Sequence, residues 1–233
     1  MIYPKHIALI PDWNRTRAKE KWFHQMIWHM EWSKTVTAII KYLFTNTEVE
    51  VFTVWGLSTE NMGNRTPEEL EYLFDLYKTF NEGLFEFMQQ NQINFKRVWS
   101  SAWLPQHLID FLLEKMRKLK FDNNKYVILA INYGGRDELI RWINKRVDET
   151  WWNKSIDENT LSSYLDFAEF PPIELVIRTK WELAKRLSGF MLWWIGYAQL
   201  YFTATKCPDF REEELKKALE RFDSIADKRN FGK

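Results

Sequence analysis

The stretch IALIPDWNRTRAKEKWFHQMIWHMEW, residues 7–32, places the chain in a structural class. It begins with a short apolar run, Ile7–Ile10, which Pro11 and Asp12 bring to an end. A four-residue apolar run closed by proline is typical of a buried strand followed by a turn. Such a turn usually needs the backbone freedom of glycine, whereas this one carries Trp13.

Further segments repeat this pattern of short apolar runs. They are Val49–Trp55, Ile93–Val98, Val127–Ile131, Leu175–Ile177 and Ala198–Phe202. Apolar runs without alternation are typical of parallel strands covered on both faces, and helical patterns separate them. We therefore predict one α/β domain over residues 1–233, with a central, mostly parallel sheet of about six strands flanked by helices.

The clearest predicted helix begins at Thr66. Thr66 can cap it, Pro67 suits its first position and Glu69 completes a capping box. Apolar side chains then follow at helical spacing as far as Met88.

The composition excludes several classes of protein. Basic and acidic side chains number 33 and 32, a net charge of +1, which argues against a general nucleic-acid binder. The single cysteine, Cys207, excludes an internal disulfide and a cysteine-rich zinc site, and favours a reducing cytoplasm. The longest apolar stretch, residues 189–202, is too short to span a bilayer, so we expect a soluble protein.

Polar side chains follow most of the predicted strands. The segments concerned are residues 12–15, 56–65, 132–136 and 178–189. In parallel sheets, ligands bind at the carboxyl ends of the strands. Arginine, hydroxyl and amide groups suit phosphate oxygens, and the carboxylate of Asp12 could hold a hard cation such as Mg²⁺.

Taken in order, these motifs resemble the cis-prenyltransferase family, of which undecaprenyl diphosphate synthase is the bacterial type. The matching segments are PDWNRTRA at 11–18, WHMEW at 28–32, LSTEN at 57–61, NYGGR at 132–136, IRTKWE at 177–182 and YAQLYF at 197–202. Each motif alone is weak, but six in one order are specific. The match extends from His6 to the final RNFGK.

The resemblance implies an enzyme that condenses isopentenyl diphosphate with an allylic diphosphate, usually farnesyl diphosphate. The product would be a long-chain polyprenyl diphosphate for a cell-envelope lipid carrier. Mg²⁺ would be the cofactor and a homodimer the assembly. The chain would grow in a hydrophobic tunnel walled by the predicted helix with Leu84, Phe85 and Met88. Because the product is a lipid, the protein would touch the inner face of the membrane only peripherally.

The resemblance also assigns roles to single residues. Asp12 and Asn61 would be catalytic, and Asp12 would hold Mg²⁺ together with the less suitable Gln199, whose family counterpart often comes from the neighbouring subunit. Arg178, Arg186 and Ser188 would grip isopentenyl diphosphate. The remaining substrate contacts would be Trp13, Asn14, Arg15, Thr16, Arg17, Gln25, His29, Ser58, Thr59, Glu60 and Arg65.

Three departures from the family pattern leave a second interpretation open. Thr16 and Gln25 replace arginines that meet phosphate, and Gln199 replaces a glutamate with a neutral, poorer Mg²⁺ ligand. These changes favour a non-catalytic binding or partner subunit of the same fold, whereas the intact Asp12, Asn61 and Arg178–Ser188 set favours an enzyme. A third class, a tryptophan-rich carbohydrate-binding module, predicts indoles on one exposed face rather than on phosphate loops.

Tryptophan stands at six positions where the family has glycine. They are Trp13, Trp22, Trp28, Trp32, Trp99 and Trp181, with Trp142, Trp151 and Trp152 as further candidates. The chain has 13 tryptophans and only 8 glycines, where about 7% glycine is usual. One cause would explain the set: a UGA codon that means glycine in the gene and was translated here as tryptophan. The alternative is a genuine tryptophan-rich variant or a decaying paralogue, with an indole crowding the phosphate site.

Overall fold

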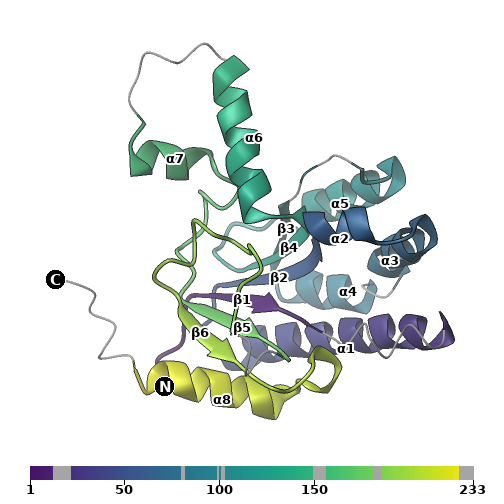
Figure 1. The fold of residues 1–233 in the computed structure, drawn as a ribbon. Coiled ribbons are helices and arrows are strands. Elements are labelled where there is room, and N and C mark those ends of the chain that lie inside the picture. The colour runs from purple at the N-terminus through teal and green to yellow at the C-terminus, as the bar shows by residue number, and fades with distance from the viewer. Residues whose placement is uncertain are drawn as a thin grey trace.

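The computed structural model describes residues 1–12, 22–79, 82–98, 100, 103–148, 156–180 and 185–225. Within helices, it describes no side chains at 22–29, 79, 82 and 146–148. The elements are β1 (His6–Ile10), α1 (Trp22–Asn46), β2 (Val51–Ser58), α2 (Thr59–Asn64), α3 (Pro67–Thr79), α4 (Glu82–Gln90), β3 (Asn94–Val98), α5 (Gln106–Lys118), β4 (Tyr126–Tyr133), α6 (Gly135–Asp148), α7 (Glu158–Tyr164), β5 (Leu175–Arg178), β6 (Gln199–Phe202), the short 3₁₀ turn η2 (Cys207–Asp209) and α8 (Glu212–Asp223) (Figure 1).

The six strands form one sheet in the order β3-β4-β2-β1-β5-β6. Every neighbouring pair is parallel, so the predicted α/β class and strand set are confirmed, and the sheet is parallel throughout. β1 is central: Ile7 pairs with Phe52 of β2 on one side and with Leu175 of β5 on the other. The chain therefore winds away from β1 in both directions. A switch point of this kind leaves a crevice at the carboxyl ends of the strands.

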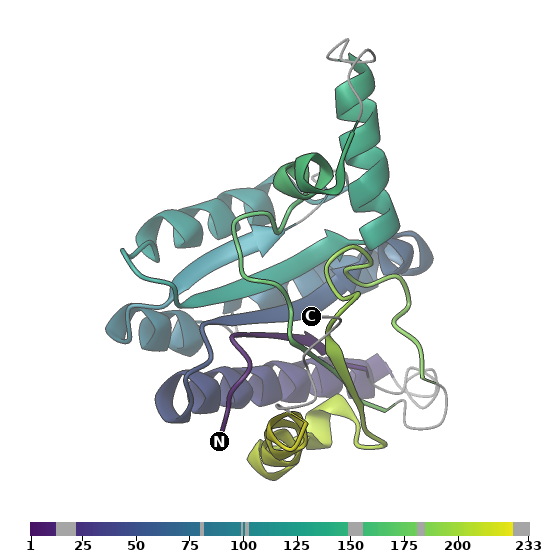
Figure 2. The same cartoon turned by 90° about the vertical axis from the view of Figure 1, so that its left-hand side faces the viewer.

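The two faces of the sheet are covered differently. Ile7 and Leu9 of β1 point into a core shared with α1, α3, α4, α5 and α8. Ala8 and Ile10 point into a second core, made with the irregular segments 167–173 and 187–198. This alternation follows from the two-residue repeat of a strand. Figures 1 and 2 show α6 and α7 projecting away from the sheet.

The predicted capping box is present at the start of α3. The backbone N–H of Glu69 donates to Oγ1 of Thr66 at 3.3 Å, and the N–H of Thr66 donates to Oε2 of Glu69 at 3.4 Å. The apolar side chains predicted to follow are divided between α3 and α4, and Leu84, Phe85 and Met88 are all buried on α4. Among the described residues, no helix is long and apolar enough to cross a membrane.

Candidate active site

A cavity of about 270 Å³ opens at the carboxyl edge of the sheet. It is bounded by the ends of β1, β2 and β5 and by α1, α2 and α3. Its acidic, basic, serine and asparagine side chains are Asp12, Ser58, Glu60, Asn61, Arg65, Arg178 and Ser188. All of these were predicted as site residues. The sheet topology thus brings together side chains from three separate motifs.

Asp12 and Arg178 form an ion pair at the switch point. Nε of Arg178 donates to Oδ2 of Asp12 at 2.6 Å, and Nη1 donates to Oγ of Ser188 at 3.0 Å and to the backbone carbonyl of Arg186. The side chain of Arg178 is 4% exposed and that of Asp12 is 28% exposed. A buried guanidinium needs a counter-charge and partners for its N–H groups, and these contacts supply both. Arg178 therefore ties the loop at 186–188 to the end of β1.

Thr179 holds the backbone of Asp12, a role that the sequence did not predict. The N–H of Asp12 donates to Oγ1 of Thr179 at 2.8 Å, and that hydroxyl donates to the carbonyl of Asp12 at 3.1 Å. The N–H of Cys207 donates to the same carbonyl at 3.0 Å. Thr179 is fully buried, and its place in the IRT motif was the signal that could have identified it.

Ser58 is both the last residue of β2 and the N-cap of α2. Its Oγ accepts from the backbone N–H of Asn61 at 3.0 Å, which is the usual cap geometry. The pairing of β2 with β4 is irregular between Trp55 and Ser58. The cap sets Glu60 and Asn61, both on the first turn of α2, against the cavity.

The NYGGR motif supports the site without lining it. A Cβ at Gly134 would lie 2.7 Å from Oγ1 of Thr59. A Cβ at Gly135 would lie 2.8 Å from the backbone N of Leu192 and 2.9 Å from the carbonyl of Gly189. The N–H of Gly135 donates to that carbonyl at 2.9 Å. Because neither glycine has a side chain, the backbone that follows β4 can approach Thr59 of α2 and the loop that carries Ser188.

Several predicted residues do not join this group. The side chains of Thr59 and Arg186 do not line the cavity, although the carbonyl of Arg186 contacts Arg178. Gln199 is the first residue of β6 and pairs with Leu175, so it lies at the amino edge of the sheet. Within one chain it is therefore not a partner for Asp12. The predictions at Trp13, Asn14, Arg15, Thr16 and Arg17 lie outside the described residues, as do the side chains of Gln25 and His29.

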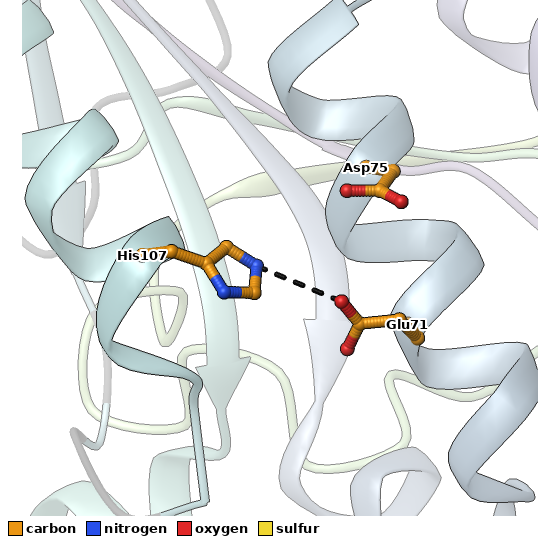
Figure 3. A group of neighbouring side chains, drawn as sticks. All are labelled: Glu71, Asp75 and His107. Carbon is orange, nitrogen blue, oxygen red and sulfur yellow. Dashed lines mark ion pairs between the residues drawn. The ribbon is translucent and has the colours of Figure 1, made fainter.

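Among the described residues, one group of three side chains has the spacing of a metal site. Glu71 and Asp75 of α3 and His107 of α5 have ligand atoms within 4.8 Å of one another, and all are exposed (Figure 3). Nε2 of His107 lies 3.8 Å from Glu71, while Asp75 forms an ion pair with Lys78 at 2.7 Å. None of them lines the cavity, so this group is separate from the predicted Mg²⁺ ligand Asp12.

The described tryptophans fall into different environments. Trp103 has φ +72° and is 87% exposed, so this bulky residue has a backbone conformation that favours glycine. Trp103 was not among the predicted glycine positions. Trp142, which was, lies buried in α6 against Tyr164 with ring centroids 6.0 Å apart, as a native tryptophan would. Trp32 lines the cavity. Trp13, Trp99, Trp151, Trp152 and Trp181 and the side chains of Trp22 and Trp28 lie outside the described residues.

A parallel α/β sheet with arginine, serine and asparagine side chains and the carboxylates of Asp12 and Glu60 around the cavity at its switch point defines a protein that binds an anionic ligand. A prenyltransferase family model, described as undecaprenyl diphosphate synthase, matches residues 10–232. The isoprenyl transferase of Fusobacterium nucleatum is 35% identical over 230 residues, which is 98% of this chain and 96% of that protein. The isoprenyl transferase of Treponema denticola is 36% identical over 219 residues, 94% and 93% of the two chains. The chain belongs to the undecaprenyl diphosphate synthase family of prenyltransferases.

Solved structures agree with this assignment. Lavandulyl diphosphate synthase from Lavandula x intermedia, in complex with dimethylallyl diphosphate, superposes with a TM-score of 0.83 at 29% identity, covering 94% of this chain and 95% of that one. A protein from Campylobacter jejuni described as a probable undecaprenyl diphosphate synthase gives a TM-score of 0.78 at 26% identity over the whole of both chains.

Proposed function

We propose that the chain is a Mg²⁺-dependent cis-prenyltransferase. It condenses isopentenyl diphosphate with an allylic diphosphate, farnesyl diphosphate above all, to give a long-chain polyprenyl diphosphate that serves a cell-envelope lipid carrier. The observation that carries the proposal is the cavity at the switch point, where Asp12, Ser58, Asn61 and Arg178 meet. Family membership and the dimethylallyl diphosphate in the lavandulyl diphosphate synthase structure support the substrate class.

The residues of the cavity suit two diphosphates. Ser188 and Arg65 offer donors to phosphate oxygens, and Arg178 adds a fixed positive charge behind them. Arg186 is exposed on the loop beside Ser188 and completes the proposed binding of isopentenyl diphosphate. In each condensation a carbon–carbon bond forms, the allylic carbon–oxygen bond breaks, and C2 of the isopentenyl unit loses a proton. Ser58 and Asn61 lie on the wall where we place that proton loss.

The donor set fits Mg²⁺. Asp12, Glu60 and Asn61 offer oxygen atoms on the same cavity, and hard cations take oxygen ligands. We assign Asp12 as the principal ligand, and when bound the ion would neutralise the departing diphosphate. Gln199 lies at the opposite edge of its own sheet, so we place any contribution from it in a second copy of the chain. The exposed Ile140 (56%) and Ile143 (50%) of the projecting α6 support the proposed homodimer.

The reaction itself tests the proposal. We expect the chain with Mg²⁺, farnesyl diphosphate and labelled isopentenyl diphosphate to give butanol-extractable label, and chelation of Mg²⁺ or Asp12→Ala to abolish it. The assay includes a version with glycine at 13, 22, 28, 32, 99 and 181. Absence of butanol-extractable label from both versions would refute the proposed enzymatic function, and the non-catalytic partner subunit would then be the remaining candidate. Two observations favour that second candidate. Gln199 is a poorer Mg²⁺ ligand than glutamate, and Nε and Nη1 of Arg178 already donate to Asp12, Arg186 and Ser188. We place the protein in the cytoplasm, with peripheral contact with the membrane.

A further inference from the structure

Two cavities meet at the side chains of Trp32 and Tyr77. The first is the polar cavity that contains Asp12 and Arg178. The second is an apolar cavity of about 30 Å³ between the sheet and its covering helices. Trp32 and Tyr77 line both, and their rings meet edge to face at 87° with centroids 6.3 Å apart. These two rings therefore form a partition between the cavity proposed for the diphosphates and the apolar space behind it.

The apolar cavity has the composition of a hydrocarbon site but not the size. Its lining comes from α1, α3, α4, α5 and the strands β2, β3 and β4, and includes Val36, Leu84, Phe85 and Leu129. A volume of 30 Å³ is room for about two water-sized probes. An isoprenoid tail that enters from the polar side must therefore displace a large side chain at the partition.

The two rings of the partition are not equally replaceable. Tyr77 is 3% exposed, and its hydroxyl is so close to Gly56 that a Cβ there would lie 2.7 Å from it. Tyr77 is thus part of the packed core. Trp32 is half-buried on α1, at the edge of that core. Removal of the Trp32 indole would therefore open space toward the apolar cavity without removing a fully buried side chain from the hydrophobic core.

We infer that residue 32 determines product length, an inference that rests on the proposed prenyltransferase function. With tryptophan there, the growing tail stops at the partition and the products are short. With glycine there, which is the residue of the family motif, the two cavities become continuous and elongation proceeds. Residue 32 is then the position that decides whether this chain makes the proposed long product.

The first test compares product lengths. The proteins are the chain itself, Trp32→Gly, Trp32→Ala and, as matched control, Trp103→Gly, which removes an exposed indole on the loop before α5. Trp32→Ala is included because alanine keeps the helix propensity that glycine lowers in α1. Each is incubated with farnesyl diphosphate, labelled isopentenyl diphosphate and Mg²⁺, and its products are separated by length. We expect several more isoprene units from both Trp32 variants than from the chain or the control.

The second test measures binding without turnover. The probes are inorganic diphosphate, farnesyl diphosphate and geranylgeranyl diphosphate, titrated into all four proteins. The measured quantity is the ratio of the Kd for farnesyl diphosphate to the Kd for geranylgeranyl diphosphate. In both Trp32 variants this ratio should be about tenfold or more higher than in the unsubstituted chain, because more of the longer tail leaves water. Inorganic diphosphate should bind equally to all four, because the charged and hydrogen-bonding side chains of the polar cavity are the same in each.

The outcomes separate the inference from the function beneath it. The inference about residue 32 is overturned if the Trp32 variants and the control give equal product lengths and equal binding ratios. The proposed prenyltransferase function would be unaffected by that result. If none of the four proteins incorporates isopentenyl diphosphate, the binding ratios alone decide whether residue 32 closes the passage, and the version with glycine at 13, 22, 28, 32, 99 and 181 decides whether the proposed function stands.

Discussion

Arg178 donates from Nε to Oδ2 of Asp12 at 2.6 Å, although the two residues are 166 positions apart in the sequence. The pair joins the end of β5 to the end of β1. It neutralises a guanidinium that is 4% exposed and leaves the carboxylate 28% exposed toward the cavity. Asp12 is therefore both the counter-ion of a buried cation and the carboxylate that a ligand in the cavity meets.

Replacement of Asp12 should affect both roles. Asp12→Ala leaves Arg178 buried without its counter-charge, so we expect a loss of about 1–3 kcal/mol in the free energy of unfolding. Product formation should fall by about 100-fold or more, because an aligned charge is lost from the site. Urea unfolding and initial rates measure the two effects. The control is Asp122→Ala at an exposed aspartate. Wild-type stability and rate in Asp12→Ala would show that the pair matters for neither.

Gly135 should tolerate no side chain. A Cβ there would lie 2.8 Å and 2.9 Å from backbone atoms of Leu192 and Gly189, which cannot yield as a flexible side chain can. Gly135→Ala should therefore cost about 1–3 kcal/mol and raise the KM for isopentenyl diphosphate, because the loop with Ser188 must move. Gly63→Ala is the matched control. Its Cβ meets nothing within 4 Å, and in α2 it should stabilise the protein by about 0.5–1 kcal/mol. Equal effects at the two glycines would contradict this account.

His6 should make stability fall in mild acid. Nδ1 donates to the carbonyl of Pro171 and Nε2 accepts from Thr53, both at 2.8 Å, and burial lowers the pKa of His6 to about 4. Since the pKa in the unfolded chain is the ordinary 6.5, only the unfolded state takes up a proton between pH 6.5 and 4. This contribution to stability is complete above pH 6.5 and is lost as the pH falls toward 4, by about 3 kcal/mol.

Unfolding of His6→Gln at pH 7 and pH 4.5 measures this contribution. The variant should lose less stability over this interval than the parent chain. His107→Gln, at an exposed histidine, should follow the parent. An unchanged pH dependence in His6→Gln would mean that other groups cause the loss.

Glycine should occupy several tryptophan positions in protein from the natural source. The tryptic peptides 6–15 and 98–115 cover Trp13, Trp99 and Trp103. Peptide mass spectrometry should find glycine at all three and tryptophan at the buried Trp142. In the chain as given, Trp103→Gly should raise stability by about 1 kcal/mol, because glycine has no strain at φ +72°. Tryptophan at residue 13 in the natural protein would refute the codon hypothesis and favour the non-catalytic subunit.

The strands and most of the cavity could be predicted because their signals are local. Short apolar runs identify β1 to β6, and the capping pair Thr66–Glu69 marks the start of α3. What the sequence did not show depends on distant contacts. Thr179, the residue after β5, holds the backbone of Asp12, Gln199 lies at the amino edge of the sheet away from Asp12, and Trp32 of α1 meets Tyr77 of α3. No spacing along the chain encodes these relations, because the sheet order creates them.

The position of Asp12 near one end of the chain and Arg178 near the other has a consequence for synthesis on the ribosome. At about 5–20 residues per second, the 166 positions between them take about 8 to 33 seconds to translate. During that interval β1 can pair with β2, but its other edge waits for β5. A nascent chain therefore exposes an open strand edge and has no assembled site until most of its length has emerged. Factors that shield nascent chains should matter more for this protein than for one whose active site is local in sequence.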